Sequence, residues 1–437
     1  MIEPLVRLPD GTVKQVNPIS GTKVWTLPGR AARPLAVARS SPRPLDPADR
    51  DRHCAFCWGR MLETPPEIAR VVRECATDGS ASGSADDLAE GPRWRELRGL
   101  LAEQLGDTTP EFRLFPNLFE ILTYDYWHLV HGFDPTPESR AHRAAYLSTP
   151  LGWDHVTALA RIRMRARGAE GADTEPFDER DLERESVALF AGNHQVVAAR
   201  RHFVDGATDD SQNAGSGTLT PEEHCEYTRF TIEAVRDLYR GNPHARYVAA
   251  FQNWLRPAGA SFDHLHKQLV AIDELGTDLE REAARLEQEP ELFTRWGADF
   301  ASARGLVVAR TPTAVAFAGV GHQYPALAVH TSNTTARPWE LSEDEVRDFS
   351  DLLHACHAAT GPEVPTNEEW HHGPPSLGLP IPLRALVKWR VSTPAGFEGN
   401  TRIYVNTIDP WTVRDRTVTR LRALAAEGRV SGRLEVT

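Results

Sequence analysis

The stretch from Phe251 to Ile272 reads FQNWLRPAGASFDHLHKQLVAI, and the interpretation of the whole chain depends on it. Its second half alternates between polar and apolar residues and then becomes continuously apolar, which predicts a β-strand that runs into a core. Side chains two apart on a strand share a face, so His264, His266 and Gln268 are expected to project together, with about 7 Å between neighbours. The small residues at positions 257–261 predict a loop whose backbone can approach a bound phosphate.

Two alternating histidines are, taken alone, more often ordinary core or surface imidazoles than parts of a site. Here they are combined with a small-residue loop and an amide in the same alternation. The stretch resembles the active-site strand of the galactose-1-phosphate uridylyltransferase branch of the histidine-triad (HIT) superfamily, whose pattern is N…G-x-S-x-x-H-x-H-x-Q. The residues that match this pattern in register are Asn253, Gly259, Ser261, His264, His266 and Gln268.

The composition is that of an ordinary globular protein. The chain has 437 residues, enough for two or three domains, with 41% hydrophobic and 25% charged residues. Its net charge of −12 argues against nonspecific binding to nucleic acids or to anionic membranes. No apolar run has the length of a signal-peptide core or a membrane span, and five cysteines do not indicate a disulfide framework, so a cytoplasmic location is expected. Only four basic residues are lysines, and one of them, Lys267, lies in the key stretch.

Residues 17–34 read NPISGTKVWTLPGRAARP and predict a turn, a short strand over Lys23–Leu27 and a second turn followed by two arginines. Alone, Arg30 and Arg33 would be interpreted as part of a solvated basic loop. The segment resembles the opening N-P-x-[TS]-G…W…P-x-R-A-x-R-P of the same family. The resemblance implies that both arginines reach the phosphates of a nucleotide, and a guanidinium fork suits phosphate oxygens.

Cys54 and Cys57 form a C-x2-C pair, which occurs in redox motifs, in zinc half-sites and by coincidence. Three nearby prolines argue against the βαβ context that a redox site needs. A zinc site needs two further ligands, and the candidates are His202 and His264. The following ETPPE matches the family's phrase after C-P-F-C, although Ala55 replaces the usual proline.

The second histidine ligand rests on another resemblance. Residues 188–202, ALFAGNHQVVAARRH, predict a strand and resemble the family's G-x-H-E-V-V-V-E-S-P-x-H, whose last histidine is a zinc ligand in members that bind zinc. That histidine is His202 here, although the glutamate and the proline of the pattern are missing. Four protein ligands would leave no position for water, so the expected role of the zinc is structural.

Two further segments resemble the family and bear on substrate binding. Residues 111–122, EFRLFPNLFEIL, predict strand, turn and strand and resemble F-P-N-x-F-x-x-L. The resemblance implies that Asn117 helps to hold the nucleotide and that Phe119 lies by the base, whereas a simple turn after Pro116 is the alternative. Residues 395–398 resemble V-G-[YF]-E, which implies that Glu398 contacts the hexose across a homodimer interface.

The resemblance implies an α+β fold of two tandem HIT-like halves, each an antiparallel sheet with packed helices. The expected boundaries are residues 1–275 for the catalytic half, with a helical insertion at about 134–186, and 276–437 for a degenerate second half. In that half the family's H-x-H is replaced by VKWRV at 387–391, so no second metal site is expected. Lys388 and Arg390 either bind an acceptor phosphate or face solvent.

These residues predict a displacement at phosphorus. A neutral imidazole is a suitable nucleophile near pH 7, and the resemblance assigns this role to His266. Gly259, Ser261 and Gln268 are expected to donate hydrogen bonds to the non-bridging oxygens. Because Gln268 cannot titrate, it cannot protonate a poor leaving group as the third histidine of HIT hydrolases does, which favours transfer between phosphates.

The expected function is a ping-pong nucleotidyltransferase that moves UMP between a UDP-sugar and a sugar 1-phosphate through a covalent nucleotidyl-histidine. The partners would then be a nucleotide-sugar and a sugar phosphate. With the same mechanism, a dinucleoside polyphosphate phosphorylase or a transferase of another nucleotide is the alternative. A zinc-stabilised nucleotide-binding protein without turnover is the alternative from a different class.

Overall fold

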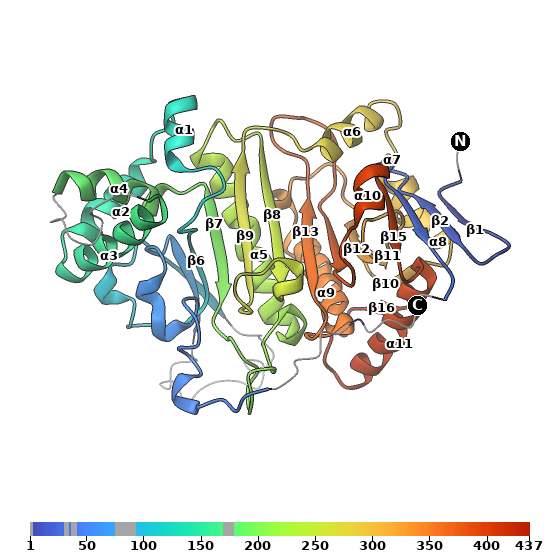
Figure 1. Ribbon diagram of the computed structural model, residues 1–437, viewed down its shortest axis with the longest axis horizontal. Coiled ribbons are helices and arrows are strands. Elements are labelled where there is room, and N and C mark those ends of the chain that lie inside the picture. Colours follow the sequence, from blue (N-terminus) through green and yellow to red (C-terminus); the bar gives the residue numbers. More distant parts are fainter. Residues whose placement is uncertain (1–2, 30–34, 36–41, 75–92, 169–178) are drawn as a thin grey trace, which may run out of the picture.

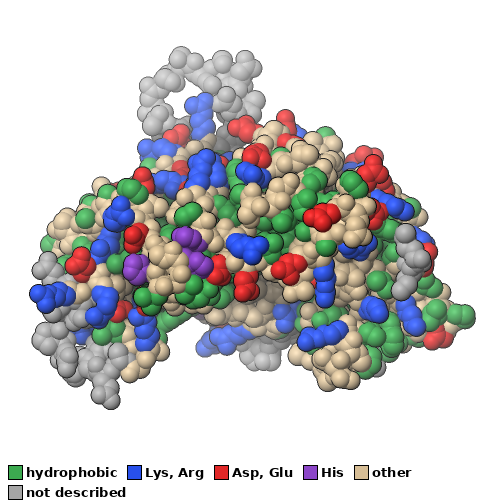
Figure 2. Space-filling model, turned by 90° about the horizontal axis from the view of Figure 1, so that it is seen from above, with side chains coloured by type: hydrophobic (Ala, Val, Ile, Leu, Met, Phe, Trp, Pro, Cys, Tyr) green, Lys and Arg blue, Asp and Glu red, His purple; other side chains and the backbone are tan. Residues whose placement is uncertain are grey.

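A computed structural model describes residues 3–29, 35, 42–74, 93–168 and 179–437 (Figure 1). Arg30 and Arg33, for which phosphate contacts are predicted, lie outside the described residues. Among the described residues, no helix combines the length and the apolar composition that crossing a bilayer requires. On the face drawn in Figure 2, basic and acidic side chains are interspersed over the surface.

The molecule is built on a 12-stranded sheet whose neighbouring strands are antiparallel. Its first six strands along the chain are β4 (Ala69–Arg73), β5 (Trp94–Arg98), β6 (Pro110–Pro116), β7 (His194–Ala199), β8 (Tyr247–Trp254) and β9 (His266–Ile272). The others are β10 (Val307–Thr311), β11 (Ala314–Ala318), β12 (Ala326–Thr331), β13 (Thr366–His371), β14 (Arg384–Trp389) and β16 (Glu435–Val436). The strand order is β16-β10-β11-β12-β14-β13-β8-β9-β7-β6-β4-β5, and Figure 1 shows its middle part from β6 through β7, β9 and β8 to β13.

Helices connect the strands and pack against them. The α-helices are α1 (Tyr124–His131), α2 (Pro137–Leu147), α3 (Pro150–Ala166), α4 (Glu179–Ala191), α5 (Pro221–Gly241), α6 (Thr277–Leu286), α7 (Leu292–Thr294), α8 (Phe300–Ala303), α9 (Glu343–Thr360), α10 (Gly396–Thr401) and α11 (Pro410–Ala426). Shorter helical segments are η1 (Pro47–Asp49), η2 (Trp58–Glu63), η4 (Ala102–Gln104), η5 (Ser216–Thr218), η6 (Arg256–Ala258), the π-helical η7 (Arg295–Asp299) and η8 (Pro338–Glu340).

The sheet contains one strand order twice. The order β8-β9-β7-β6-β4 of the first half is repeated in the second half as β13-β14-β12-β11-β10. Each repeat places one long helix, α5 or α9, against its strands, and the two helices contact each other. β8 pairs with β13, so the repeats join edge to edge. The expected α+β fold of tandem halves is confirmed, while the boundaries 1–275 and 276–437 stay a prediction.

Each long helix begins at a Ser/Thr-x-x-Glu sequence, which predicts a helix start. Thr220 caps α5 and forms a reciprocal capping box with Glu223, and Ser342 does the same for α9 with Glu345. Each box satisfies two backbone N–H groups that would otherwise lack a partner at the helix start.

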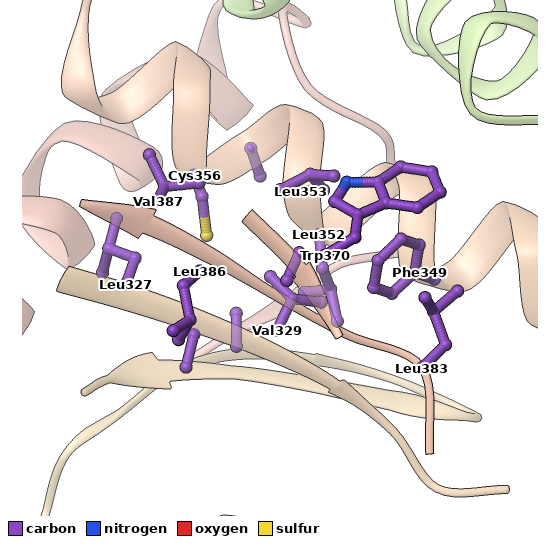
Figure 3. Packing of buried hydrophobic residues seen from close by; sticks show 14 of the residues in the cluster. Leu327, Val329, Phe349, Leu352, Leu353, Cys356, Trp370, Leu383, Leu386 and Val387 are labelled. Carbon is purple, nitrogen blue, oxygen red and sulfur yellow. The ribbon is translucent and has the colours of Figure 1, made fainter. Parts of the chain in front are cut away.

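The second half has a continuous apolar core under α9. Figure 3 shows Cys356 of the helix close to Val387 of β14, and Phe349 close to Trp370 of β13 and to Leu383, and all five side chains are buried. Burying an apolar side chain of this size stabilises a fold by about 1.5–3 kcal/mol. The second half is therefore well packed, although its sequence motifs have diverged further.

A second sheet joins the start of the chain to its end. Its strands are β1 (Leu5–Arg7), β2 (Val13–Val16), β3 (Lys23–Thr26) and β15 (Ile403–Asn406), and β15 pairs with β3 in parallel. Within the region expected to be an insertion, α2 and α3 pack with α4 around a small core of their own. The fully buried residues of that core include Tyr146, Val156, Leu159, Leu182 and Leu189.

Three predicted elements differ in the structure. The second strand predicted within 111–122 does not form, because the Asn117 side chain accepts a hydrogen bond from the Phe119 N–H and turns the chain, and α1 begins soon after. The charged residues of Thr277–Phe300 predict one helix, but the helix ends at Leu286 and resumes at Leu292, since Pro290 lies between and cannot donate a backbone hydrogen bond. The predicted strand over 188–202 is confined to β7, because residues 188–191 complete α4.

Candidate active site and metal centre

β9 lies inside the sheet between β8 and β7, and its side chains alternate between the two faces of the sheet. Ala198 of β7 lies opposite His266 and Val196 lies opposite Gln268, while Phe251 of β8 lies opposite Gln268 on the other side. Lys267 points to the opposite face, toward α5 and the core, and is fully buried. The candidate site therefore occupies the face of the sheet that α5 and α9 leave uncovered.

Four side chains from three separate segments meet beside this strand, and they are Cys54, Cys57, His202 and His264, all buried. The two sulfurs lie 3.8 Å apart, and the sulfur-to-Nδ1 distances are 3.4–3.7 Å. A tetrahedral zinc ion with bonds of about 2.3 Å to sulfur and about 2.0 Å to nitrogen needs S–S edges of roughly 3.8 Å and S–N edges of roughly 3.5 Å. The cluster has this geometry and can bind a metal ion of that kind.

Cys57 and His202 are biased toward the forms that bind a metal, whereas the hydrogen bond with Cys57 and burial raise the pKa of Cys54. Hydrogen bonds from Cys54 and from the two histidines lower the pKa of Cys57, and burial lowers the pKa of His202. His264 donates from Nε2 to the carbonyl oxygen of Ala199 at 2.6 Å, which leaves the Nδ1 lone pair turned toward the sulfurs. A thiolate and neutral imidazoles are the ligand forms that bind metal ions.

His266 is held as a neutral imidazole with one nitrogen free for chemistry. Its Nδ1 donates to the carbonyl oxygen of His264 at 2.7 Å, so Nε2 carries the lone pair. Burial lowers the pKa of His266 to about 4, and 4% of the residue is exposed. Phe56 packs edge-on against the ring, with centroids 5.0 Å apart, and fixes its orientation. This is the state that a nucleophilic imidazole requires at neutral pH.

The loop before β9 is held in an unusual backbone conformation. Gly259 has φ +91°, a left-handed conformation that suits glycine, and Leu255 at the start of the loop has φ +66°. Asn253 lies just before this loop at the end of β8, and Gly259 approaches its side-chain nitrogen. Ser261 is exposed and lines a cavity of about 740 Å³ next to Cys54.

Most of the predicted binding residues gather around β9, with one exception. Asn117 Nδ2 and Gln268 Oε1 each lie 3.0 Å from His194 Nε2, and Phe119, two residues after Asn117, is 57% exposed. Glu398 caps α10 by accepting from the Ala395 N–H, and Figure 1 shows α10 over the second half, away from β9. Within one chain, Glu398 is therefore not part of the His266 site.

The side chains of Lys388 and Arg390 contact different parts of the molecule. Lys388 donates to Glu369 at 2.5 Å and lines a cavity of about 720 Å³ in the second half. Arg390 lies beyond the end of β14 and donates to Asn367 at 2.6 Å. Neither side chain is simply solvated, and the two do not face one common pocket.

Sequence reasoning did not assign roles to three residues that contact the site. Phe56 lies between the two cysteines of the C-x2-C pair, His194 lies within the quoted stretch 188–202, and Asn367 lies on β13, a strand that was not predicted. The signal for His194 was its alternation with Val196 and Ala198 on a strand next to β9. No comparable signal marks Asn367, whose strand reads TNEEWH.

The fold is shared with solved structures of known proteins. An ADP-glucose phosphorylase from Arabidopsis thaliana with bound ADP-glucose aligns over 93% of this chain and 97% of its own, with 16% identity and a TM-score of 0.55. A GalT-like protein from Arabidopsis thaliana aligns over 92% and 97%, with 15% identity and a TM-score of 0.53. At this level of identity the similarity establishes the fold, and it confirms the fold that the sequence motifs implied.

Comparison of the sequence with other proteins identifies the family. No curated protein matches the chain. A family model described as "Domain of unknown function (DUF4921)" matches residues 8–437, which is nearly the whole chain. The chain therefore belongs to the DUF4921 family and has the fold of galactose-1-phosphate uridylyltransferase-like proteins of the HIT superfamily.

Proposed function

We propose that the protein is a nucleotidyltransferase that works through a covalent nucleotidyl–His266 intermediate. The observation that carries the proposal is the state of this imidazole: buried, neutral, with Nδ1 bound to the His264 carbonyl oxygen and Nε2 free. A histidine that serves only the core has no need for a free nitrogen beside a glycine loop and two side-chain amides. The fold shared with an ADP-glucose phosphorylase supports a nucleotide-sugar as the donor.

The reaction consists of two displacements. His266 Nε2 attacks the α-phosphorus of the nucleotide-sugar, an N–P bond forms, and the bond to the bridging oxygen breaks to release a sugar phosphate. An oxygen of a second phosphate then attacks the same phosphorus and returns the imidazole to its neutral form. Hydrogen bonds from Gln268 and from the Gly259–Ser261 loop stabilise the charge on the non-bridging oxygens. The leaving phosphate needs no proton, which suits an amide at position 268.

The Cys54, Cys57, His202 and His264 cluster is proposed to hold one structural zinc ion. Four protein ligands close the coordination sphere. The ion would contribute folding free energy and fix His264, the residue whose carbonyl oxygen orients the nucleophile.

The first candidate reaction is UMP transfer between a UDP-sugar and a sugar 1-phosphate. An alternative within the same chemistry uses an ADP-sugar with inorganic phosphate as the acceptor, and the observation that favours it is the ADP-glucose bound to the structural neighbour. The described residues near the base, Asn117 and Phe119, leave both possibilities open to assay.

Isotope exchange tests the proposal. Labelled glucose 1-phosphate is mixed with unlabelled UDP-glucose or ADP-glucose, with no other acceptor. A covalent intermediate predicts that label enters the nucleotide-sugar in wild type, while His266→Asn abolishes the exchange and retains the metal. Exchange at the wild-type rate in His266→Asn contradicts the proposal. Binding of a nucleotide-sugar without any exchange favours the binding-protein alternative.

We also propose a homodimer in which Glu398 binds the sugar held by its partner. Glu398 lies away from β9 in its own chain, and its neighbour Phe397 is a large apolar residue that is 45% exposed. Glu398→Ala is expected to raise the KM for the sugar phosphate. An unchanged KM and kcat, or a fully active monomer in light scattering, contradicts this arrangement.

A further inference from the structure

The side-chain amide of Gln268 is oriented by His194. The backbone N–H of Ile121 points at His194 Nδ1 at 3.3 Å, and a backbone N–H can only donate, so the imidazole proton is on Nε2. That Nε2 lies 3.0 Å from Gln268 Oε1 and donates to it. Burial lowers the pKa of His194 to about 4, which keeps the ring neutral with one proton. The Gln268 oxygen is thereby engaged, and its NH2 group is left for the site.

Asn117 does not compete for this proton. Its Oδ1 accepts from the Phe119 N–H at 3.0 Å, so its Nδ2, which lies 3.0 Å from His194 Nε2, is a donor. A donor cannot accept the imidazole proton. Gln268 Oε1 is thus the acceptor for that proton among these neighbours.

The side-chain amide of Asn253 is oriented in the same way by the second half. Arg390 has only donors, and its NH1 lies 2.6 Å from Asn367 Oδ1, which fixes Asn367 Nδ2 as a donor. That Nδ2 donates to Asn253 Oδ1 at 2.7 Å and to the carbonyl oxygen of Ala258 at 2.8 Å. Asn253 therefore also has its oxygen engaged and its NH2 group available, and the glycine loop is held by the same residue.

The two amides flank the nucleophile. Gln268 is two residues from His266 on the same face of β9. The register that pairs Phe251 with Gln268 places Asn253 opposite His266 when it is continued by two residues. Negative charge at a transferring phosphoryl group is spread over its non-bridging oxygens, where fixed N–H donors stabilise it most. A flipped amide would present its oxygen there and repel that charge.

We propose that His194 and Asn367 are positioning residues that hold the NH2 groups of Gln268 and Asn253 toward the phosphoryl group transferred to His266. The inference rests on the proposed function and adds to it a task for the second half, which reaches the site through Asn367 and Arg390. Neither positioning residue contacts the substrate. Their loss should therefore slow the chemical step more than it weakens substrate binding.

Single-turnover labelling tests the inference. His194→Leu removes the donor to Gln268, and Asn367→Asp keeps the size of the side chain and its contact with Arg390 but removes the donor to Asn253. Each is expected to slow nucleotidylation of His266 by about 100-fold, as loss of one such donor does elsewhere, with a much smaller change in the Kd of the donor. His194→Gln, whose amide can again donate to Gln268, should recover most of the rate. Metal content and Tm serve as controls.

Four outcomes overturn the inference. Variants that label at the wild-type rate, or a His194→Gln variant no better than His194→Leu, contradict it while the proposed function stands. A wild-type protein that forms no adduct contradicts the proposed function, and with it this inference. Equal losses in rate and in donor affinity would show that the two residues serve binding in general, which also contradicts the positioning role.

Discussion

The residues from His264 to Gln268, which lead into β9 and form its start, have different tasks. His264 belongs to the metal cluster, His266 presents a free nitrogen, and Gln268 presents an amide, while Lys267 is directed into the core. The strand conformation makes this division possible because it alternates side chains between two faces. The carbonyl oxygen of His264 also links the candidate metal cluster directly to His266, the proposed nucleophile.

The proposed zinc site predicts how a single cysteine substitution changes zinc content and stability. Cys54→Ser should lose the zinc and several kcal/mol of stability, because structural zinc contributes folding free energy. Cys225→Ser, at a cysteine outside the cluster, is the matched control and should keep both. Elemental analysis and thermal unfolding check the pair. A Cys54→Ser protein with full zinc content would show that the cluster is not the metal site.

The roles of His264 and His266 should be separable by mutation. His264→Asn is expected to reduce zinc content, stability and labelling together, since it removes a ligand and disturbs the segment that orients His266. His266→Asn is expected to remove labelling alone, because its ring contacts the cluster only through the His264 backbone. Zinc content and Tm of the two variants give the answer, and equal metal loss in both would contradict the assignment.

Glu120, three residues after Asn117, predicts a pH dependence of stability. Burial raises its pKa to about 7 from an ordinary value of 4.5, against the attraction of Arg163. Between these values the folded protein binds a proton that the unfolded chain has released, so stability falls as pH rises through this window. Glu120→Gln should therefore raise Tm more at about pH 8 than at about pH 5. The exposed Glu287→Gln is the control, and an equal effect at both pH values for Glu120→Gln would contradict the prediction.

Among the elements, a buried charge pair connects β9 and β13, the two strands on either side of β8. Lys267 donates to Glu368, both fully buried, and Glu368 also accepts from His357 at 2.6 Å and from Trp370 at 2.5 Å. Although burial opposes it, the charge of Lys267 keeps the pKa of Glu368 well below its usual range. The pair connects the strand of the nucleophile to the second half.

Breaking this pair should lower the free energy of unfolding. Lys267→Met leaves the Glu368 carboxylate buried without its cation, which costs about 3–5 kcal/mol in comparable buried pairs. Adding Glu368→Gln should recover part of that loss, because a neutral amide is cheaper to bury than an unpaired carboxylate. Urea unfolding of the single and double variants measures both. A single variant within about 1 kcal/mol of wild type would contradict the importance of the pair.

The elements that could be predicted from the sequence are those with local signals. β9 shows a period of two, and α5 and α9 carry their capping boxes in the sequence. β13 could not be predicted because its polar letters, TNEEWH, serve tertiary contacts: Asn367 and Glu369 face the site side, and Glu368 pairs with Lys267 in the core. A strand whose buried face carries a paired charge has no apolar alternation to detect.

For the whole molecule, the joined sheet explains how a diverged second half still serves the site. The second half pairs with one edge of β8 through β13, supplies Asn367 and Arg390, and binds Lys267 through Glu368. The candidate metal cluster could be anticipated because the C-x2-C pair is visible in the sequence and the resemblance to the family implies the histidine ligands. Contacts such as His194 with Gln268 depend on strand order, and strand order is set by packing over the whole chain.

The central claim is that His266 becomes covalently nucleotidylated, and intact-protein mass spectrometry tests it most directly. Wild type incubated with UDP-glucose or ADP-glucose, without acceptor, should gain the mass of one nucleoside monophosphate. The adduct should map to His266, be labile in acid, and disappear when a sugar phosphate or inorganic phosphate is added. His266→Asn should remain unmodified. Absence of any adduct across a panel of nucleotide-sugars and dinucleotides, or an adduct that persists in His266→Asn, would contradict the account.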